Sequence, residues 1–301
     1  MRTWPRLLCA SLAATLVVVS AAGGARAQEP EPAGWDPAYT HAGRWDYALG
    51  VFGGGMLLTE TILLQNHEPE ARWFGPILFD QAAHDATRGR WPQLRGDAAT
   101  ASWVLWFALM GYPLAVDVPY AWSRYGSQVA WDLFWQDATV LTLSGAFDFA
   151  ARDLVGRVRP SNQECLDSGG TRTGCLRGPE TRRSFPSGHV TETTTATALL
   201  CTQHLKLKLY GGPWDAVACL TAIVADVAVG TLRLVADNHW ATDVVAGGAI
   251  GVAFGWGIPT LMHLHGHAPS VTIGRGASAI RMAPVPIAVG AGGGLGMAGW
   301  F

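Results

Sequence analysis

The chain has 301 residues, of which 49% are hydrophobic and 15% are charged. This composition fits either a rather apolar globular domain or a polytopic membrane protein. A formal net charge of −2 excludes a surface built for general polyanion binding, so no nucleic-acid partner is expected.

Residues 1–27 have the pattern of a secretory signal peptide. Two arginines precede an apolar run, and the small-residue sequence Ala25-Arg26-Ala27 provides a cleavage site. We expect cleavage after Ala27 and therefore an exported protein. Residues 28–44 are rich in Glu, Pro and Ala, a composition typical of a flexible linker.

Six apolar segments follow and predict an all-α helical domain in residues 45–267. A polar stretch, residues 67–95, predicts a short interfacial helix or a surface loop between the first two helices. The last helix carries Gly247, Gly251 and Gly255 at four-residue spacing, which allows close packing against another helix. The expected helices are residues 45–64, 98–116, 128–151, 190–205, 214–235 and 239–263.

The character of the chain changes after the last helix. His263, His265 and His267 alternate at its end, and we expect solvated side chains there rather than metal ligands. Residues 268–301 form a glycine-rich tail in which short β-prone runs predict a β-hairpin.

The sequence Pro186-Ser187-Gly188-His189 lies directly before the fourth helix. A helix start binds anions because its first backbone N–H groups have no intrahelical partner and the macrodipole adds positive charge. Ser187 adds a hydroxyl donor, Gly188 allows close approach of a ligand, and His189 titrates near neutral pH. The motif therefore predicts phosphate binding beside a proton-transfer group, although alone such a turn is commonly only a cap.

Two flanking segments make the functional interpretation stronger. Upstream, Arg152 and Arg159 supply guanidinium groups suited to bidentate contacts with phosphate oxygens. Downstream, Arg233 is followed by His239 and Asp243, which share a face if they lie four residues apart on one helix. The carboxylate would then hold one imidazole nitrogen and leave the other as a nucleophile.

Together these segments resemble the signature of the type 2 phosphatidic acid phosphatase (PAP2) superfamily, which also holds the class A acid phosphatases and the vanadium haloperoxidases. The signature reads Lys-x6-Arg-Pro, Pro-Ser-Gly-His and Ser-Arg-x5-His-x3-Asp, and its spacings recur from Arg152 to Asp243. The hydrophobic pattern extends the likeness to about residues 45–263. Arg152 stands in place of Lys and Leu232 in place of Ser, which puts one phosphate hydrogen bond in doubt.

The resemblance implies a six-helix PAP2-type bundle and a phosphatase that works without metal through a phosphohistidine. His239, oriented by Asp243, would be the nucleophile, and His189 would protonate the leaving alcohol and then activate water. No cofactor is expected, except that vanadate would fill the phosphate site of a haloperoxidase. The phosphate-binding residues would be Arg152, Arg159, Ser187, Gly188 and Arg233.

Several functions remain open at this point. A phosphatase acting on lipid phosphates, such as phosphatidate or a polyprenyl pyrophosphate, fits an apolar bundle beside an arginine-rich pocket. A soluble acid phosphatase acting on small phosphomonoesters fits the cleavable signal. Haloperoxidases of the superfamily are usually much longer, and a non-enzymatic envelope protein would lack a catalytic residue. Arg182 and Arg183 are expected either to assist the substrate headgroup or to lie in a solvated loop.

Four cysteines remain if Cys9 is lost with the signal peptide. An oxidising compartment favours disulfides, and the spacing is not typical of a zinc site. Of the three connectivities we favour Cys165–Cys175, which closes the polar loop between the first two motifs, and Cys201–Cys219, which ties two neighbouring helices.

Two segments, residues 98–116 and 244–262, are long enough and free of charge for crossing a membrane. If residue 28 lay outside and the first three helices all crossed, Arg152 would lie in the cytoplasm, where Cys165–Cys175 would stay reduced. We therefore expect membrane association, with the active site on the periplasmic side of a bacterial envelope and with some helices packed in the bundle or at the interface instead of spanning.

Overall fold

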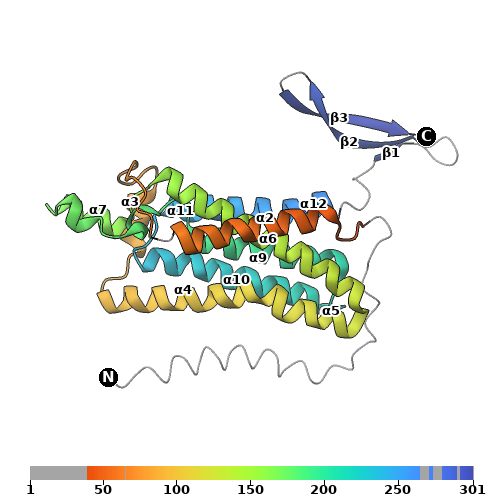
Figure 1. Cartoon of the computed structure of the whole chain (residues 1–301), viewed down its shortest axis with the longest axis horizontal. Helices are drawn as coiled ribbons and strands as arrows, with labels where there is room; N and C mark the ends of the chain where they lie inside the picture. The colour runs from red at the N-terminus through yellow and green to blue at the C-terminus, as the bar shows by residue number, and fades with distance from the viewer. Residues whose placement is uncertain (1–38, 65, 265–270, 274–279, 290–291, 301) are drawn as a thin grey trace. The chain divides into compact units, whose positions relative to one another are not determined.

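The structure is a computed structural model that describes residues 39–64, 66–264, 271–273, 280–289 and 292–300. The expected signal peptide and most of the expected linker lie outside the described residues, as do His265 and His267. Within the described residues, the helical domain is all-α, which confirms the fold class predicted from the sequence (Figure 1).

Six long helical rods make up the described part of this domain. Three of the rods contain a π-helical turn: the first rod ends in it, and the other two continue beyond it as a further α-helix. The rods are α2 (Arg44–Thr59) with η2 (Glu60–Leu64); α4 (Pro92–Tyr112) with η3 (Pro113–Asp117) and α5 (Val118–Tyr125); α6 (Ser127–Val155); α9 (Gly188–Leu207); α10 (Trp214–Val235); and α11 (Ala241–Val252) with η5 (Ala253–Gly257) and α12 (Ile258–Met262).

Shorter elements join the rods. The polar stretch predicted as a helix or a loop contains α3 (Asp80–Thr87), and the stretch between the first two motifs contains α7 (Pro160–Asp167), α8 (Arg172–Cys175) and the 3-10 turn η4 (Pro179–Arg182). In the tail, β1 (Val271–Ile273), β2 (Ile280–Val289) and β3 (Gly292–Trp300) pair in that order as an antiparallel sheet.

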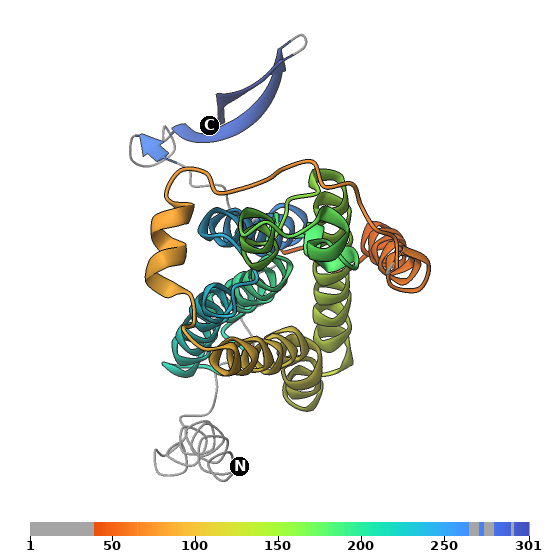
Figure 2. The ribbon, with the colours of Figure 1, turned by 90° about the vertical axis from the view of Figure 1, so that its left-hand side faces the viewer.

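Helix α9 is the central rod and packs against α4, α6, α10 and α11 with η5 (Figure 2). The glycine seam predicted from the sequence is the surface through which the last rod contacts α9. A Cβ atom on Gly247 would lie 2.9 Å from the Ser187 carbonyl oxygen, and one on Gly251 would lie 2.6 Å from the Cβ of Thr194. Only glycine allows these backbones to approach so closely, so the seam fixes the last rod against the start of α9.

The helices carry their polar groups inward and many apolar side chains outward. Buried Asp137 accepts a hydrogen bond from Gln203 at 2.7 Å, and Asp226 accepts hydrogen bonds from Thr193 and Thr194. The outward faces expose large apolar side chains, including Phe52, Phe107, Trp122, Leu220, Val227 and Leu261. An apolar outer face suits a lipid environment better than water.

Three rods are long and apolar enough to cross a membrane: Pro92–Tyr125, Trp214–Val235 and Ala241–Met262. Two of them contain the segments expected from the sequence. The third, Trp214–Val235, was not expected because it carries Asp215 and Asp226. In the structure both carboxylates hydrogen-bond within the protein, Asp215 to His204 at 2.7 Å, so neither has to face lipid.

The two ends of the bundle differ. At one end, here called the terminal end, α2 begins and α12 ends: the Thr40 N–H donates to the His263 carbonyl oxygen at 3.1 Å, and His263 Nε2 lies 2.7 Å from Asp46. The expectation that His263 is solvated is therefore wrong, because its ring is buried between these partners. At the other end, here called the motif end, α6 ends and α9 begins.

Candidate active site

The start of α9 forms the anion-binding turn that the sequence predicts. Ser187 is the N-cap residue, and its buried hydroxyl makes no hydrogen bond within the part of the chain that the structure describes. A Cβ atom on Gly188 would lie 2.7 Å from an Asp148 oxygen and 3.1 Å from the Arg152 Cζ. Glycine at this position therefore lets the Arg152 guanidinium lie directly against the turn.

Arg152, Arg159 and Arg233 come from three separate elements and meet at this turn. Arg152 lies in the last turn of α6, Arg159 is the N-cap residue of α7, and Arg233 lies in the last turn of α10. All three lie close enough for their charges to act on His189. Five of the residues predicted to form the site, counting Ser187, are thus brought together, and the cluster is strongly positive.

His239 lies in the turn between α10 and α11, because α11 begins only at Ala241. Its Nδ1 lies 2.7 Å from the Ser184 carbonyl oxygen, an acceptor, so Nδ1 carries the proton. Its Nε2 is left with a lone pair and lies 3.4 Å from Arg233 Nη2. Burial, with the charges of Arg233 and Arg159, holds the pKa of His239 well below its ordinary value, so the ring is neutral.

The predicted hydrogen bond between His239 and Asp243 is not formed. His239 Nδ1 lies 3.8 Å from Asp243 Oδ2, too far for a hydrogen bond. The prediction was wrong because it placed both residues on one helix, whereas Asp243 caps that helix by accepting the Trp240 N–H at 2.8 Å. Asp243 also accepts the Ser184 hydroxyl at 2.6 Å, so it fixes the residue whose carbonyl orients His239.

The sequence analysis did not single out Arg157 as a site residue. Arg157 is the centre of the hydrogen bonds that hold Asp243 and, through it, the orientation of His239. It is fully buried and donates to Asp243 at 2.5 Å and to Asp80 of α3 at 2.6 Å. Its guanidinium lies 4.1 Å from the centroid of the Trp73 ring. Its place between Arg152 and Arg159 was visible in the sequence, but its partners lie about eighty residues away on either side.

His189 faces the same cluster from the first turn of α9. Its ring meets Trp103 of α4 edge-on, with the ring centroids 4.2 Å apart, and Trp106 lies on the same side at 6.1 Å. His189 Nε2 is buried and has no hydrogen-bond partner among the described residues. Both tryptophans were missed, because aromatic side chains in an apolar segment give no signal of a site.

Arg182 and Arg183 have carboxylate partners of their own, and Arg183 borders the cluster through Glu180. Arg183 is only 1% exposed, donates to Asp153 at 2.5 Å and to the His67 carbonyl oxygen, and lies over the Phe149 ring. Arg182 pairs with Glu68 at 2.8 Å. Because Arg183 is buried, it does not lie in a solvated loop, and assistance to the substrate headgroup stays a prediction.

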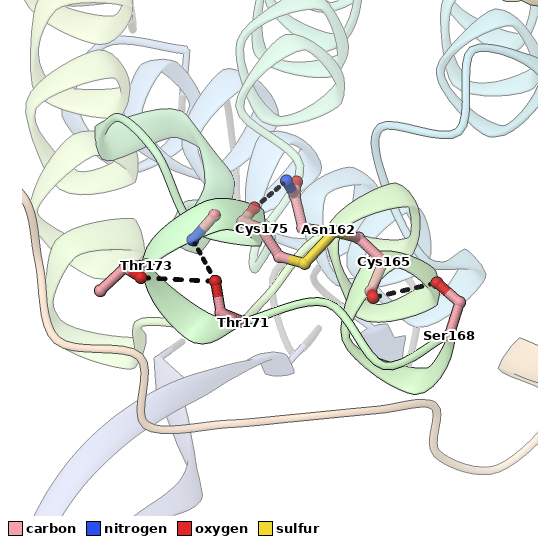
Figure 3. Close-up of a disulfide and its surroundings, with 7 residues drawn as sticks. Asn162, Cys165, Ser168, Thr171, Thr173 and Cys175 are labelled. Atoms are coloured by element: carbon pink, nitrogen blue, oxygen red, sulfur yellow. Dashed lines mark hydrogen bonds between the residues drawn. A yellow bond between two sulfur atoms is a disulfide. The ribbon is translucent and has the colours of Figure 1, made fainter.

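Both favoured disulfides are present. Cys165 at the end of α7 is bonded to Cys175 in α8, with the Asn162 amide donating to the Cys175 carbonyl oxygen at 2.7 Å (Figure 3). Cys201 of α9 is bonded to Cys219 of α10. Within the described residues there is no group of three or more His, Cys, Asp or Glu side chains placed to hold a metal ion.

These features define a helical protein with a cluster of three arginines beside two imidazoles. The sequence pattern of the PAP2 superfamily matches residues 134–266, which is less than half of the chain, and the chain is similar to this superfamily over that stretch. A lipid A 1-phosphatase of Porphyromonas gingivalis is 36% identical over 121 residues, which is 40% of this chain and 21% of that protein. The chain therefore spans about a fifth of the length of this relative.

A solved structure is also similar. It is a transmembrane PAP2-type phosphatidylglycerolphosphate phosphatase from Bacillus subtilis, with 16% sequence identity and a TM-score of 0.46. The likeness covers 72% of this chain and 94% of that one.

Proposed function

We propose that the chain is a phosphatase that hydrolyses lipid phosphate esters through a phosphohistidine on His239. The observation that carries the proposal is the position of a neutral imidazole against three clustered arginines, with its Nε2 lone pair engaged only by a long 3.4 Å contact from Arg233 Nη2. A neutral imidazole is the form that can attack phosphorus, and guanidinium groups are the donors that best match phosphate oxygens.

The reaction is then a two-step transfer. His239 Nε2 attacks phosphorus and the bond from phosphorus to the ester oxygen breaks, while His189, protonated in the complex with the anionic substrate, gives its proton to the leaving alkoxide. Without phosphate, burial and the charges of Arg233, Arg159 and Arg152 lower the pKa of His189 to about 2, so the ring takes up this proton when the negative charge of the substrate enters the cluster. His189 next takes a proton from water, the resulting hydroxide attacks phosphorus, and the bond to His239 breaks to release inorganic phosphate. Arg152, Arg159 and Arg233, together with Ser187 and the start of α9, stabilise the charge on the transferring group.

Three features favour a lipid as the substrate. The relative from P. gingivalis is by name a phosphatase of lipid A, and the outward apolar faces of the rods suit a membrane. Trp103 and Trp106 also place apolar surface beside His189, where the leaving group would sit. We further propose that the site lies on the periplasmic side, because the Cys165–Cys175 disulfide lies at the motif end.

The proposal is tested with the protein purified in detergent and assayed on phosphatidate, lipid A, a polyprenyl pyrophosphate and p-nitrophenyl phosphate. We expect phosphate release from a lipid that persists in EDTA and that falls by at least about 10³-fold in His239→Ala. A preference for p-nitrophenyl phosphate without detergent would favour the soluble acid phosphatase. Bromide oxidation with vanadate and peroxide would favour a haloperoxidase. Full activity of His239→Ala would exclude it as the nucleophile.

A further inference from the structure

Glu180 of η4 is a carboxylate that binds one of the clustered arginines. Arg159 Nη2 donates to Glu180 Oε2 at 2.5 Å, and Arg183 Nη1 lies 3.4 Å from Glu180 Oε1. The Arg159 side chain is 12% exposed and that of Glu180 is 57% exposed, so the pair lies where the cluster meets solvent. The charge of Glu180 also acts on Arg152 and Arg233.

This contact opposes phosphate binding. A carboxylate oxygen and a phosphate oxygen use the same guanidinium N–H groups, so a bound phosphate has to share Arg159 with Glu180 or displace it. Arg152 already pairs with Asp148 at 2.8 Å. With two carboxylates beside three arginines, the cluster offers a phosphate dianion a net charge of about +1 instead of the +2 that it would have without Glu180.

The backbone holds Glu180 in this position. Arg159 and Glu180 lie at the two ends of one segment, and the Arg159 N–H donates to the carbonyl oxygen of Thr181, the residue after Glu180, at 3.1 Å. Between these ends the Cys165–Cys175 disulfide joins α7 to α8 (Figure 3). The disulfide therefore restricts how far η4 can move away from Arg159.

We propose that Glu180 is a built-in competitor of phosphate for Arg159, held there by the segment 160–182, within which the Cys165–Cys175 disulfide closes a shorter loop. The inference rests on the phosphate site of the proposed function. Its consequence is specificity: free inorganic phosphate binds weakly and leaves quickly, whereas an ester gains further contacts through its leaving group. Glu180 thereby limits product inhibition without touching the reacting atoms.

The test is the affinity of the full chain in detergent for inorganic phosphate, measured by calorimetry, together with inhibition of turnover by phosphate. Glu180→Gln keeps the size of the side chain and removes its charge, and we expect phosphate to bind roughly tenfold more tightly. Glu180→Ala should act in the same direction. Glu70→Gln is the matched control, because Glu70 is exposed and pairs with Arg72 instead of with η4 or a clustered arginine, so this variant should leave phosphate binding unchanged.

The disulfide is tested in the same assay. Replacing Cys165 and Cys175 together by serine should tighten phosphate binding by a smaller factor, and should add nothing in the Glu180→Gln background. If the disulfide and Glu180 only stabilised the fold, phosphate binding would weaken in every variant. Unchanged or weaker phosphate binding in both Glu180 variants would overturn the proposal while turnover of lipid phosphates stands. Tighter binding in a chain with no turnover would keep the proposal and reject the phosphatase function.

Discussion

The orientation of His239 depends on a backbone carbonyl instead of a carboxylate. Ser184 accepts the Nδ1 proton, and Asp243 acts one step further away by holding the Ser184 hydroxyl and the Trp240 N–H. A carbonyl fixes the tautomer as well as a carboxylate does, but it brings no negative charge to stabilise a protonated ring. In the proposed mechanism Asp243 is therefore a positioning residue, and its carboxylate pairs with Arg157 at 2.5 Å.

This geometry predicts that Asp243→Asn is milder than His239→Ala. We expect kcat/KM to fall by roughly 10- to 100-fold in Asp243→Asn, because the Ser184 carbonyl still orients the ring, and by at least about 10³-fold in His239→Ala. Asp80→Asn is the matched control, since Asp80 also pairs with Arg157 but has no contact with Ser184. An equal loss of activity in Asp80→Asn would show that Asp243 acts only by stabilising Arg157.

At the scale of single residues, the sequence analysis located the motif residues but not the side chains that hold them in place, such as Arg157 and Asp80. The spacing of three short motifs was enough to bring Arg152, His189 and Arg233 to one place, because each motif begins or ends a helix. Asp80 could not be assigned, since it is one carboxylate in a long polar stretch and its contact with Arg157 spans 77 residues. A contact of this kind depends on how the whole bundle packs.

Among the elements, α3 is attached to the motif end through charged side chains. His84 Nε2 lies 2.8 Å from Asp237, in the turn after α10, and Arg88 Nε donates to the other oxygen of Asp237 at 2.9 Å. The hydrogen bond to Asp237 raises the pKa of His84 above its ordinary value. Since Asp80 lies on the same helix, this attachment also holds the carboxylate that pairs with Arg157.

The raised pKa predicts a pH-dependent stability. A histidine with a raised pKa contributes stability that is fully present below its unfolded-state pKa of 6.5 and is lost as pH rises through the folded-state value. We expect the melting temperature of the wild type in detergent to exceed that of His84→Gln by on the order of 2 °C at pH 6, and by less at pH 9. A constant difference would assign the effect to packing instead of charge. Asp85 and Arg88 also face His84 and remain in both proteins.

The glycine seam of the last rod provides a second prediction at this scale. A side chain on Gly251 would overlap Thr194 and the Thr191 carbonyl oxygen, so Gly251→Val has to push the rod away from α9. We expect a loss of about 1–3 kcal/mol of stability and a fall in kcat, because the rod carries Asp243. Gly257→Val is the control, since a Cβ there meets nothing within 4 Å. Similar losses in both variants would point to helix propensity.

The helices themselves were mostly predictable, because apolar runs between polar turns mark them plainly. The start of the last helix was not. A continuous pattern from His239 suggested one helix, but Asp243 accepts the Trp240 N–H and begins α11 at Ala241. Such a cap becomes visible only when the other partners of the carboxylate, Arg157 and Ser184, are known. Because α11 begins at Ala241, His239 lies in the turn before this helix instead of in its first turn.

For the whole molecule, the direction of each rod determines which groups share a side of a membrane. Three rods, α2, α4 with α5, and α6, separate the terminal end at Arg44 from the motif end at Arg152. If all of them cross, residues near Arg44 lie on the side opposite to the Cys165–Cys175 disulfide. The alternative expectation, in which some rods do not cross, places both on the exported side.

Single cysteines can distinguish these arrangements, because the four other cysteines of the described residues are bonded in pairs and do not react with maleimide. Arg44→Cys reports on the terminal end and Arg90→Cys, in the exposed turn before α4, reports on the motif end. An oxidised Cys165–Cys175 pair predicts that Arg90→Cys is labelled by an impermeant maleimide in cells whose inner membrane is intact.

The labelling of Arg44→Cys then decides how many rods cross. Labelling of Arg44→Cys only after that membrane is opened would mean that an odd number of the three rods cross. Labelling of both would mean that at least one of the three packs without crossing. Labelling of Arg44→Cys alone would place the arginine cluster in the cytoplasm, where no periplasmic lipid phosphate could reach it.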